Sequence, residues 1–349
     1  MILLRVGLLG LKKEYDNTVG QGIQKYMYQM YSRLKGRKDV EVEVAEYNDT
    51  FPFMGSGISF MLGNMFKDFS SYDIIHSLDQ KPLLALRKGN AKLVVTAHDF
   101  QPLLAPQYND TGIKEILWNP IIQLGMRLSL RADHMIARSK LTHRDAVRLG
   151  YDKNKITIIN DGVDERFFRK AAAKKGHGFR VGYIGALRKR KNVEFAIEAF
   201  KRFGNRKASF EIWGKKQFLY SKLESMASED KRIRMMGLAP EQRLVEVYDS
   251  FDAFVFPSFY EGFGIPIIEA QARGLPVIIY KHGKMTDEVK KYCFEAEDED
   301  HMAQILEDIS TNGYNDSRRK KAIEYARGFT WQKEADETLA LYKKLVKNG

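Results

Sequence analysis

The stretch that decides the fold is AFVFPSFYEGFGIPIIEAQARGLPVIIY, residues 253–280. Its first four residues are apolar, which is typical of a buried strand in a parallel sheet. A segment rich in Pro, Gly and aromatic residues then interrupts the strand. Pro266 suits the first turn of a helix, and Gly274 suits the position just after a helix ends, before a further strand over residues 277–280. The stretch therefore predicts a strand–loop–helix–strand unit with a glycine-rich loop at the helix N-terminus.

That helix N-terminus is predicted to bind an anion. Backbone amides at Phe263, Gly264 and Ile265 would point out of the helix, where its dipole favours a phosphate or pyrophosphate. Glu269 follows about one helical turn later, within reach of hydroxyls such as a ribose diol. Glu261 precedes the helix, at the carboxyl end of the strand, where ligands bind in open α/β sheets. The alternative is a plain βαβ unit with a surface glutamate, but the glycines, the proline and both glutamates agree on one anion site.

Glu261 and Glu269 have the spacing of the E-x7-E pattern of retaining GT-B glycosyltransferases. The motif Pro-Ser-x-x-Glu-Gly-Phe-Gly-Ile-Pro-x-x-Glu-Ala at residues 257–270 closely resembles glycosyltransferase family 4, the glycosyl transferases group 1. The resemblance implies that Glu261 contacts the donor sugar, that Glu269 holds the ribose, and that the amides of Phe263, Gly264 and Ile265 hold the phosphates. It covers nearly the whole chain and is strongest over residues 180–280.

The family resemblance also implies an α/β fold of the GT-B type, in which two Rossmann-like domains face each other across a cleft. We expect an N-terminal, acceptor-binding domain over residues 1–170 and a C-terminal, nucleotide-sugar-binding domain over residues 171–330. A last helix over residues 331–349 would cross back to the first domain. The small, basic, aperiodic segment 169–178 is interpreted as the interdomain linker.

The composition agrees with a two-domain globular protein that binds anions. The 349 residues are 44% hydrophobic and carry a formal net charge of +12, and the length allows two domains of about 150 residues. Residues 1–170 hold 25 basic and 19 acidic side chains, and the remainder holds 32 and 26. Because the excess is spread evenly, it favours anionic ligands or an anionic membrane surface over nucleic acid. A generally basic proteome would explain it equally well.

The expected location is the cytoplasm, with the inner face of the membrane as a peripheral alternative. Cys293 is the single cysteine, so an intramolecular disulfide is excluded and a reducing compartment is expected. The first ten residues carry Arg5 and no cleavage site, which indicates a first strand rather than a signal peptide. No uninterrupted apolar run reaches the length of about 18 residues that a transmembrane helix needs.

Two segments of the first half have competing interpretations. Gly22 lies in the glycine loop after the first predicted strand, over residues 3–9, and a Gly-x-Gly alone is as compatible with an ordinary tight turn. In the family, such a loop faces the donor phosphates from the opposite domain. The uncharged segment 51–66 is either packed against the sheet, which we favour, or exposed to lipid or a lipid-linked acceptor.

Two predicted strands end in histidine, at His76 and His98. A lone histidine at a strand end is usually structural, and we interpret His76 in that way. His98 lies in Thr-x-His-Asp, which resembles the family position where a histidine borders the sugar and the acceptor, so we assign it to the site. The amphipathic helix predicted over residues 118–131 is either an ordinary surface helix or a membrane-facing one.

The second domain is expected to supply a cationic site for the leaving diphosphate. Arg188, Lys189, Arg190 and Lys191 follow a predicted strand that ends near Gly185. A solvated turn is the ordinary interpretation of four cations, but their place at a carboxyl strand end favours phosphate binding. Lys191 falls on the family lysine. The family arginine is replaced by Ala186, so the second charge must come from Arg190 or Arg188.

Three further features of the sequence complete the predicted chemistry. Gly214 resembles the family's glycine turn near the nucleotide base. Asp298 and Asp300 offer an Asp-x-Asp metal site, but acidic residues are favoured at a helix start without any metal, so we expect no metal ligands and no cofactor. The function implied is retaining transfer of a sugar from a UDP-, GDP- or ADP-sugar to a glycan, lipid-linked glycan or small molecule. The alternatives are a nucleotide-sugar epimerase or phosphorylase of the same fold, and a non-catalytic sugar-nucleotide binding module.

Overall fold

The computed structural model describes residues 3–9, 23–44, 68–80, 87–111, 113–169 and 178–347. The chain divides into two compact units. Unit 1 comprises Met1–Leu104, Ile116–Gly162 and Trp331–Gly349, and unit 2 comprises Ala105–Glu115 and Val163–Thr330. Gly22, the segment 51–66 and most of the predicted linker lie outside the described residues.

Unit 1 is built on a parallel sheet with the strand order β2-β1-β3-β4-β5-β6. Strands β3 and β5 consist entirely of buried residues, as expected for parallel strands with helices on both faces. The strands are β1 (Leu4–Leu9), β2 (Val40–Val44), β3 (Ile74–Ser77), β4 (Lys92–Ala97), β5 (His134–Ala137) and β6 (Ile156–Ile158).

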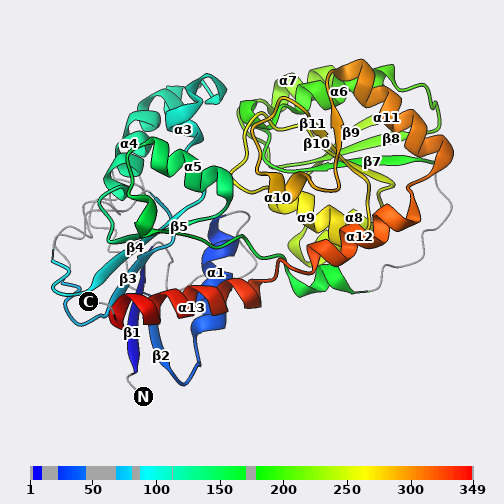
Figure 1. Ribbon diagram of the computed structural model, residues 1–349. Helices are drawn as coiled ribbons and strands as arrows, with labels where there is room; N and C mark the ends of the chain where they lie inside the picture. Colours follow the sequence, from blue (N-terminus) through cyan, green and yellow to red (C-terminus); the bar gives the residue numbers. More distant parts are fainter. Residues whose placement is uncertain are drawn as a thin grey trace. The chain divides into compact units, whose positions relative to one another are not determined.

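The helices of unit 1 include one from each end of the chain. In Figure 1, α13 (red) lies beside α1 (blue), and the two helices pack together. The helices are α1 (Ile23–Leu34), α3 (Gln101–Leu104), α4 (Ile113–Ser129), α5 (Lys140–Arg148), α13 (Trp331–Lys347) and the 3-10 turn η3 (Lys153–Lys155). The predicted start of α4 at residue 118 is wrong by five residues. Lys114, Glu115 and Leu117 favour helix, and Pro120 is accommodated within it.

Unit 2 is built on a second parallel sheet with the strand order β12-β11-β10-β7-β8-β9. Strand β10 is fully buried and lies between β7 and β11. The strands are β7 (Arg180–Ile184), β8 (Ser209–Trp213), β9 (Ile233–Gly237), β10 (Ala253–Phe256), β11 (Val277–Tyr280) and β12 (Phe294–Ala296). The strands predicted over residues 253–256 and 277–280 are thus confirmed with those bounds.

Helices cover both faces of this second sheet, with α6, α7 and α11 on one face and α8, α9 and α12 on the other (Figure 1). The helices are α6 (Val193–Arg202), α7 (Tyr220–Ser228), α8 (Leu244–Asp249), α9 (Ile265–Ala272), α10 (Asp287–Lys290), α11 (Glu299–Asn312) and α12 (Asp316–Ala326). Four 3-10 turns complete the unit: η2 (Pro106–Tyr108), η4 (Glu165–Phe168), η5 (Lys189–Lys191) and η6 (Glu241–Arg243). One continuous apolar core joins the sheet to these helices.

A cluster of buried charged side chains connects α13 to the sheet of unit 1. Arg138, just after β5, donates from Nε to Asp161 at 2.8 Å and from Nη2 to Glu334 of α13. Glu334 also accepts the Gly162 backbone N–H at 2.7 Å. All three charged side chains are buried. Buried charges are stable only when they are paired, so this cluster specifies where the last helix packs.

Removing one partner of this cluster should destabilise the protein. Glu334→Ala leaves Arg138 buried with only one carboxylate and should lower the free energy of unfolding by about 3 kcal/mol, measured by urea unfolding. Glu337→Ala is the matched control, because its exposed pair with Lys333 on the same helix should contribute less than about 0.5 kcal/mol. Equal losses in the two variants would contradict the structural importance of the cluster.

His76 should make stability depend on pH. Its ring lies fully buried between Tyr342 and Thr96, which fits the structural role predicted for it. Burial, with a contribution from Arg138, lowers the pKa of His76 to about 3. The unfolded chain therefore binds a proton as the pH falls through 6.5, whereas the folded chain does not. The contribution of His76 to stability should fall by about 2 kcal/mol between pH 8 and pH 5. In His76→Gln this slope should flatten, and an unchanged slope would refute the assignment.

Candidate active site

The glycine-rich loop between β10 and α9, residues 257–264, is here called the elbow. Gly264 has φ +104° and caps α9, and Pro266 occupies the second position of the helix. A positive φ at this position favours glycine, which has no Cβ. Gly274 has φ +71° just past the C-terminal end of the helix. The predicted helix and both of its glycine boundaries are therefore confirmed, and the amino end of α9 lies at the carboxyl edge of the sheet.

Glu261 in the elbow is buried and bound to two cations. Lys191 Nζ donates to Glu261 Oε1 at 2.5 Å, and Arg190 Nη1 lies 3.4 Å from Oε2. Both cations come from η5, which follows β7, the strand next to β10 in the sheet. Parallel neighbours present their carboxyl ends at one edge. The sheet therefore brings together the two sequence motifs that were predicted to share one site.

Electrostatics keep Glu261 ionised despite its burial. Burial acts to raise the pKa of this carboxyl, but the charges of Lys191 and Arg190 outweigh it and hold the pKa below its ordinary value. Lys191 Nζ also lies 4.9 Å from the centre of the Phe256 ring, a cation–π distance. Burial, reinforced by Glu261, raises the pKa of Tyr183 far above its usual range. The site is thus a buried carboxylate and a buried lysine, with a partly exposed arginine beside them.

The segment Arg188–Lys191, here called the basic turn, is attached to the elbow through the backbone. The Phe259 N–H donates to the Arg190 carbonyl at 2.8 Å, and Arg190 Nη1 donates to the Tyr260 carbonyl at 3.2 Å. Asn192 ends the turn with φ +52°, a conformation that asparagine tolerates better than most residues. Of the two candidates for the charge missing at Ala186, Arg190 is the one that reaches Glu261.

Glu269 lies within α9 and is also buried. It accepts a hydrogen bond from the Tyr248 hydroxyl at 2.8 Å. Burial, together with the neighbouring Glu269, raises the pKa of Tyr248 far above its usual range, so the phenol stays protonated as a donor. Tyr248 fixes one carboxylate oxygen of Glu269. The motif in the sequence pointed to the glutamate, but no sequence signal marked its tyrosine partner.

Two further residues that sequence reasoning missed support the basic turn. Asp110 is buried, and its Oδ1 accepts the Lys189 N–H at 2.9 Å while its Oδ2 lies 3.6 Å from Arg188 Nε. The Tyr108 ring stacks on the Phe259 ring of the elbow, with centroids 4.6 Å apart. The segment 105–115 that carries them belongs to unit 2 although it lies in the first third of the chain. No motif identifies them, since 79 positions separate Asp110 from Lys189.

Gly214 lies at the carboxyl end of β8, next to the carboxyl end of β7. Its N–H donates to the Gly237 carbonyl at 2.8 Å, and a Cβ at this position would clash with the Gly185 carbonyl and the Leu187 side chain. The glycine is therefore required by close backbone packing. Its predicted contact with the nucleotide base remains a prediction.

His98 follows β4 in unit 1 and is half-buried. Its Nε2 lies 2.9 Å from the Leu78 carbonyl, and its ring meets Tyr26 edge to face at 4.9 Å. A carbonyl can only accept, so Nε2 carries the proton and the neutral ring has its lone pair on Nδ1. His98 is thus a fixed, oriented imidazole at a strand end. Gly22, whose loop was predicted to face the donor phosphates, lies outside the described residues.

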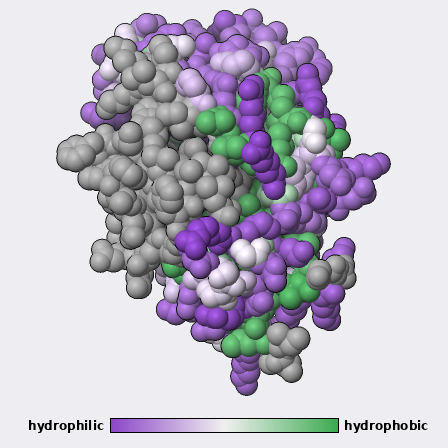
Figure 2. Space-filling model, turned by 90° about the vertical axis from the view of Figure 1, so that its left-hand side faces the viewer, coloured by the Kyte–Doolittle hydropathy of each residue, from purple (hydrophilic) through white to green (hydrophobic). Residues whose placement is uncertain are grey.

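The described residues also bear on metal and membrane binding. Among the described residues, no group of His, Cys, Asp and Glu side chains could hold a metal ion, and Asp298 caps α11 by accepting the His301 N–H. No described helix combines the length and apolar character that spanning a bilayer requires. Figure 2 shows one face of the molecule, on which hydrophobic areas (green) lie among hydrophilic residues (purple). Leu124 on α4 is one exposed apolar side chain, 51% accessible.

Comparison with known families identifies the protein family to which this chain belongs. The family model described as "Glycosyl transferases group 1" matches residues 164–329, which contain the basic turn and the elbow. The model "Glycosyltransferase Family 4" matches residues 31–167. The chain belongs to the group 1, family 4 glycosyltransferases. It is accordingly an enzyme of the hexosyltransferase type.

Relatives and solved structures agree with this membership. Over 304 residues the glycosyltransferase is 27% identical to the D-inositol 3-phosphate glycosyltransferase of Kribbella flavida, a match that covers 78% of this chain and 71% of the relative. The sucrose-phosphate synthase of Thermosynechococcus elongatus superposes with a TM-score of 0.78 at 18% identity, covering 99% of this chain and 100% of that one. Anabaena HepE, crystallised with UDP and glucose, gives 0.72 at 16% identity over 98% and 100%. The expected α/β fold of the GT-B type is confirmed.

Asp110 should act on the glycosyltransferase reaction by positioning the basic turn. Asp110→Ala removes both contacts and should lower kcat about tenfold, because small displacements of charged groups are costly in catalysis. Asp110→Asn keeps an oxygen for the Lys189 N–H and should stay within about threefold of wild type. Steady-state kinetics would measure both variants.

Glu324→Ala provides the matched control for Asp110, since among the described residues Glu324 pairs only with Arg327, at 3.8 Å on an exposed face. Its kcat should be unchanged. Wild-type turnover in Asp110→Ala, or an equal loss in the alanine and asparagine variants, would contradict the positioning role.

Proposed function

We propose that this glycosyltransferase transfers a sugar from a nucleoside-diphosphate sugar to an acceptor hydroxyl with retention of anomeric configuration and without a metal ion. The observation that carries the proposal is the cluster of Glu261, Lys191 and Arg190 beside the amino end of α9. A carboxylate for sugar hydroxyls and two cations for a diphosphate lie at one edge of one sheet. A nucleoside-diphosphate sugar fits this arrangement, because its sugar would meet the carboxylate and its phosphates would meet the cations.

The positive charge in the site stabilises the leaving group. The bond from the anomeric carbon to the β-phosphate oxygen breaks, and negative charge grows on the departing diphosphate. Lys191, Arg190 and the unpaired amides at the start of α9 meet that charge. The two cations already lie against Glu261, so they are oriented before the donor arrives. Because side chains and the helix dipole supply the charge, the proposal needs no metal.

The acceptor oxygen forms its bond to the anomeric carbon on the face from which the diphosphate departs. Its proton passes to an oxygen of the leaving phosphate, so the step balances without a covalent enzyme intermediate. Glu261 binds hydroxyls of the transferred sugar, and Glu269, oriented by Tyr248, binds the ribose diol. Gly214 is assigned to the surroundings of the nucleotide base.

In this proposal unit 2 forms the donor domain, and unit 1, which includes α13, forms the acceptor domain. His98 is assigned to the sugar and acceptor, because its ring is held in one orientation by Leu78 and Tyr26. The Gly22 loop is assigned to the donor phosphates by the family resemblance. The acceptor is a glycan, a lipid-linked glycan or a small molecule. The enzyme works in the cytoplasm, with the inner face of the membrane as the alternative location.

The presence of UDP and glucose in the HepE crystals supports a nucleotide sugar as the donor here. The non-catalytic alternative rested on Ala186, where the family has an arginine. Arg190 places a guanidinium beside Glu261, which favours a working enzyme over a silent binding module.

The direct test is a screen of UDP-, GDP- and ADP-sugars for thermal stabilisation, followed by diphosphate release with and without lipid-linked and soluble acceptors. One nucleotide sugar should stabilise the protein, and an acceptor should accelerate diphosphate release. Proton NMR of the first product should show the anomeric configuration of the donor. Inversion, dependence on a divalent metal, or binding without any turnover or slow hydrolysis would overturn the proposal.

Substitutions at the two ends of the donor site should change different kinetic quantities. Lys191→Ala should lower kcat by about 10²- to 10³-fold, the typical loss when a group that stabilises developing charge is removed. Glu269→Ala should instead weaken donor binding about tenfold, since the ribose is bound equally in ground and transition states. Donor titration and steady-state kinetics would measure both. Wild-type turnover in Lys191→Ala would remove that residue from the mechanism.

A further inference from the structure

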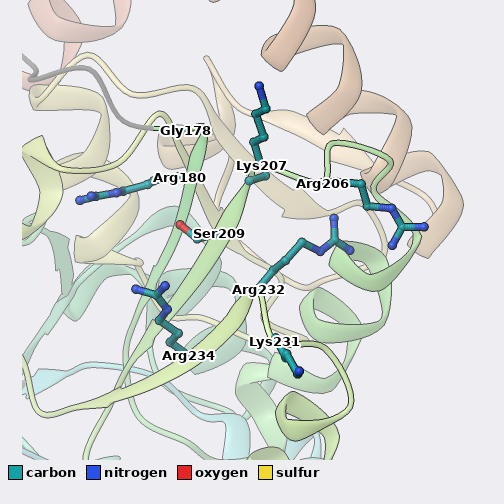
Figure 3. A pocket seen from close by; sticks show the side chains of 9 residues that line it. Gly178, Arg180, Arg206, Lys207, Ser209, Lys231, Arg232 and Arg234 are labelled. Atoms are coloured by element: carbon teal, nitrogen blue, oxygen red, sulfur yellow. The ribbon is translucent and has the colours of Figure 1, made fainter.

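Unit 2 has a second cationic region, a hollow of about 380 Å³ that we call the basic hollow. Its lining contains six basic side chains and no acidic one. They are Arg180, Arg206, Lys207, Lys231, Arg232 and Arg234. Figure 3 shows these side chains around Ser209, with Arg180 and Arg234 on one side and Arg206 and Arg232 on the other. The family resemblance and the proposed mechanism use none of them.

The basic hollow lies at the edge of the sheet opposite the elbow. Arg180 is the first residue of β7, Ser209 is the first residue of β8, and Arg232 immediately precedes β9. In a parallel sheet the amino ends of all strands share one edge. The elbow and the basic turn follow the carboxyl ends, and a five-residue strand such as β7 spans roughly 16 Å. The hollow is therefore separate from the donor site.

Most of the charge in the hollow has no internal counter-charge. Arg232 is one exception, because it binds Asp230 at 2.7 Å and donates to the Phe203 and Asn205 carbonyls. Arg206 also lies close enough to Asp230 to help lower the pKa of that carboxyl. Among the described residues, Arg180, Lys207, Lys231 and Arg234 form no ion pair. Arg234 faces Glu211 across the β8–β9 register, but Glu211 is buried and accepts from the Trp213 indole.

Like charges gathered in this way repel one another, and an anionic ligand would relieve the repulsion. Ser209 Oγ, which has no hydrogen-bond partner among the described residues, adds a neutral donor among the cations. Guanidinium groups bind phosphate oxygens well because their N–H groups form a planar fork. The side chains in Figure 3 spread outward rather than converge on one point. That arrangement suits several phosphate groups better than one small ion.

The geometry points to a second anion site in this glycosyltransferase, in which the basic hollow binds a ligand that carries more than one phosphate group. The ligand is either a soluble phosphorylated molecule or the phosphate headgroups of an anionic lipid surface, which share the same recognition chemistry. The site is independent of the donor site, so it stands or falls separately from the proposed function.

Charge reversal tests the basic hollow. Inorganic tripolyphosphate is titrated into the full-length protein by calorimetry at about 50 mM salt, where screening is modest. The double variant Lys207→Glu/Arg234→Glu should bind at least about tenfold more weakly than wild type, since each cation near an anionic ligand contributes appreciably. Arg180→Gln, which removes a single charge, should also weaken binding. Thermal unfolding checks that the variants are folded.

Two controls make the outcome specific. Lys320→Glu/Lys321→Glu makes the same charge change on exposed α12 positions and should bind within about twofold of wild type. Lys191→Ala removes a cation of the donor site, so it should weaken only the tripolyphosphate binding that occurs there and should retain the binding that is lost in Lys207→Glu/Arg234→Glu. Equal loss in both double variants, loss only in Lys191→Ala, or failure of the wild type to bind either tripolyphosphate or lipid would overturn the inference.

Sedimentation with vesicles distinguishes the two sources of phosphate. Vesicles of phosphatidylglycerol and phosphatidylcholine in equal parts are compared with vesicles of phosphatidylcholine alone. Binding to the anionic vesicles that is lost in Lys207→Glu/Arg234→Glu, without tripolyphosphate binding, assigns the site to lipid headgroups. Tripolyphosphate binding without vesicle binding assigns it to a soluble ligand. Either pattern, with the α12 control unaffected, supports the basic hollow as an anion site.

Discussion

The structure of the site depends on one buried ion pair, between Lys191 and Glu261. The two residues are 70 positions apart in the sequence, yet they follow neighbouring parallel strands and meet at one edge of the sheet. Loss of Glu261 would remove the carboxylate that Lys191 and Arg190 share, whereas loss of Lys191 would leave the buried Glu261 with Arg190 alone. Removing one partner of a buried ion pair is costly. The pair therefore matters both for stability and for the proposed reaction, because the same contact orients the Lys191 ammonium and keeps the Glu261 carboxylate ionised.

The residues around the Lys191–Glu261 pair restrict its movement. The basic turn shares backbone hydrogen bonds with the elbow through Phe259, and Asp110 holds the same turn from a segment far away in the sequence. Phe256 closes one side of Lys191. Groups oriented in this way need little reorganisation when charge develops, which is the main source of catalytic power in sites of this kind. An electrostatic mechanism requires such rigidity more than it requires any single reactive side chain.

The two edges of the unit 2 sheet use positive charge in opposite ways. At the carboxyl edge, each cation of the site has a carboxylate beside it, and burial makes that pairing obligatory. At the amino edge, the basic hollow is open to water, where unpaired cations are tolerated and available to a ligand. The buried cluster of unit 1 resembles the carboxyl edge of unit 2, since Arg138 is fully buried and paired with both Asp161 and Glu334. Burial thus decides whether a cation serves the fold or remains available for binding.

The sequence by itself determined the local chemistry. The strand–elbow–helix unit, its glycine boundaries and the paired motifs at Glu261 and Lys191 follow from short-range rules on φ, helix ends and apolar runs, which act within about ten residues. Tertiary structure alone decided which partners those residues have. Tyr248 beside Glu269, Asp110 beneath the basic turn, and the choice of Arg190 over Arg188 all depend on contacts between distant segments. The basic hollow was equally hidden, because its six cations come from three strand beginnings and nothing in their spacing groups them.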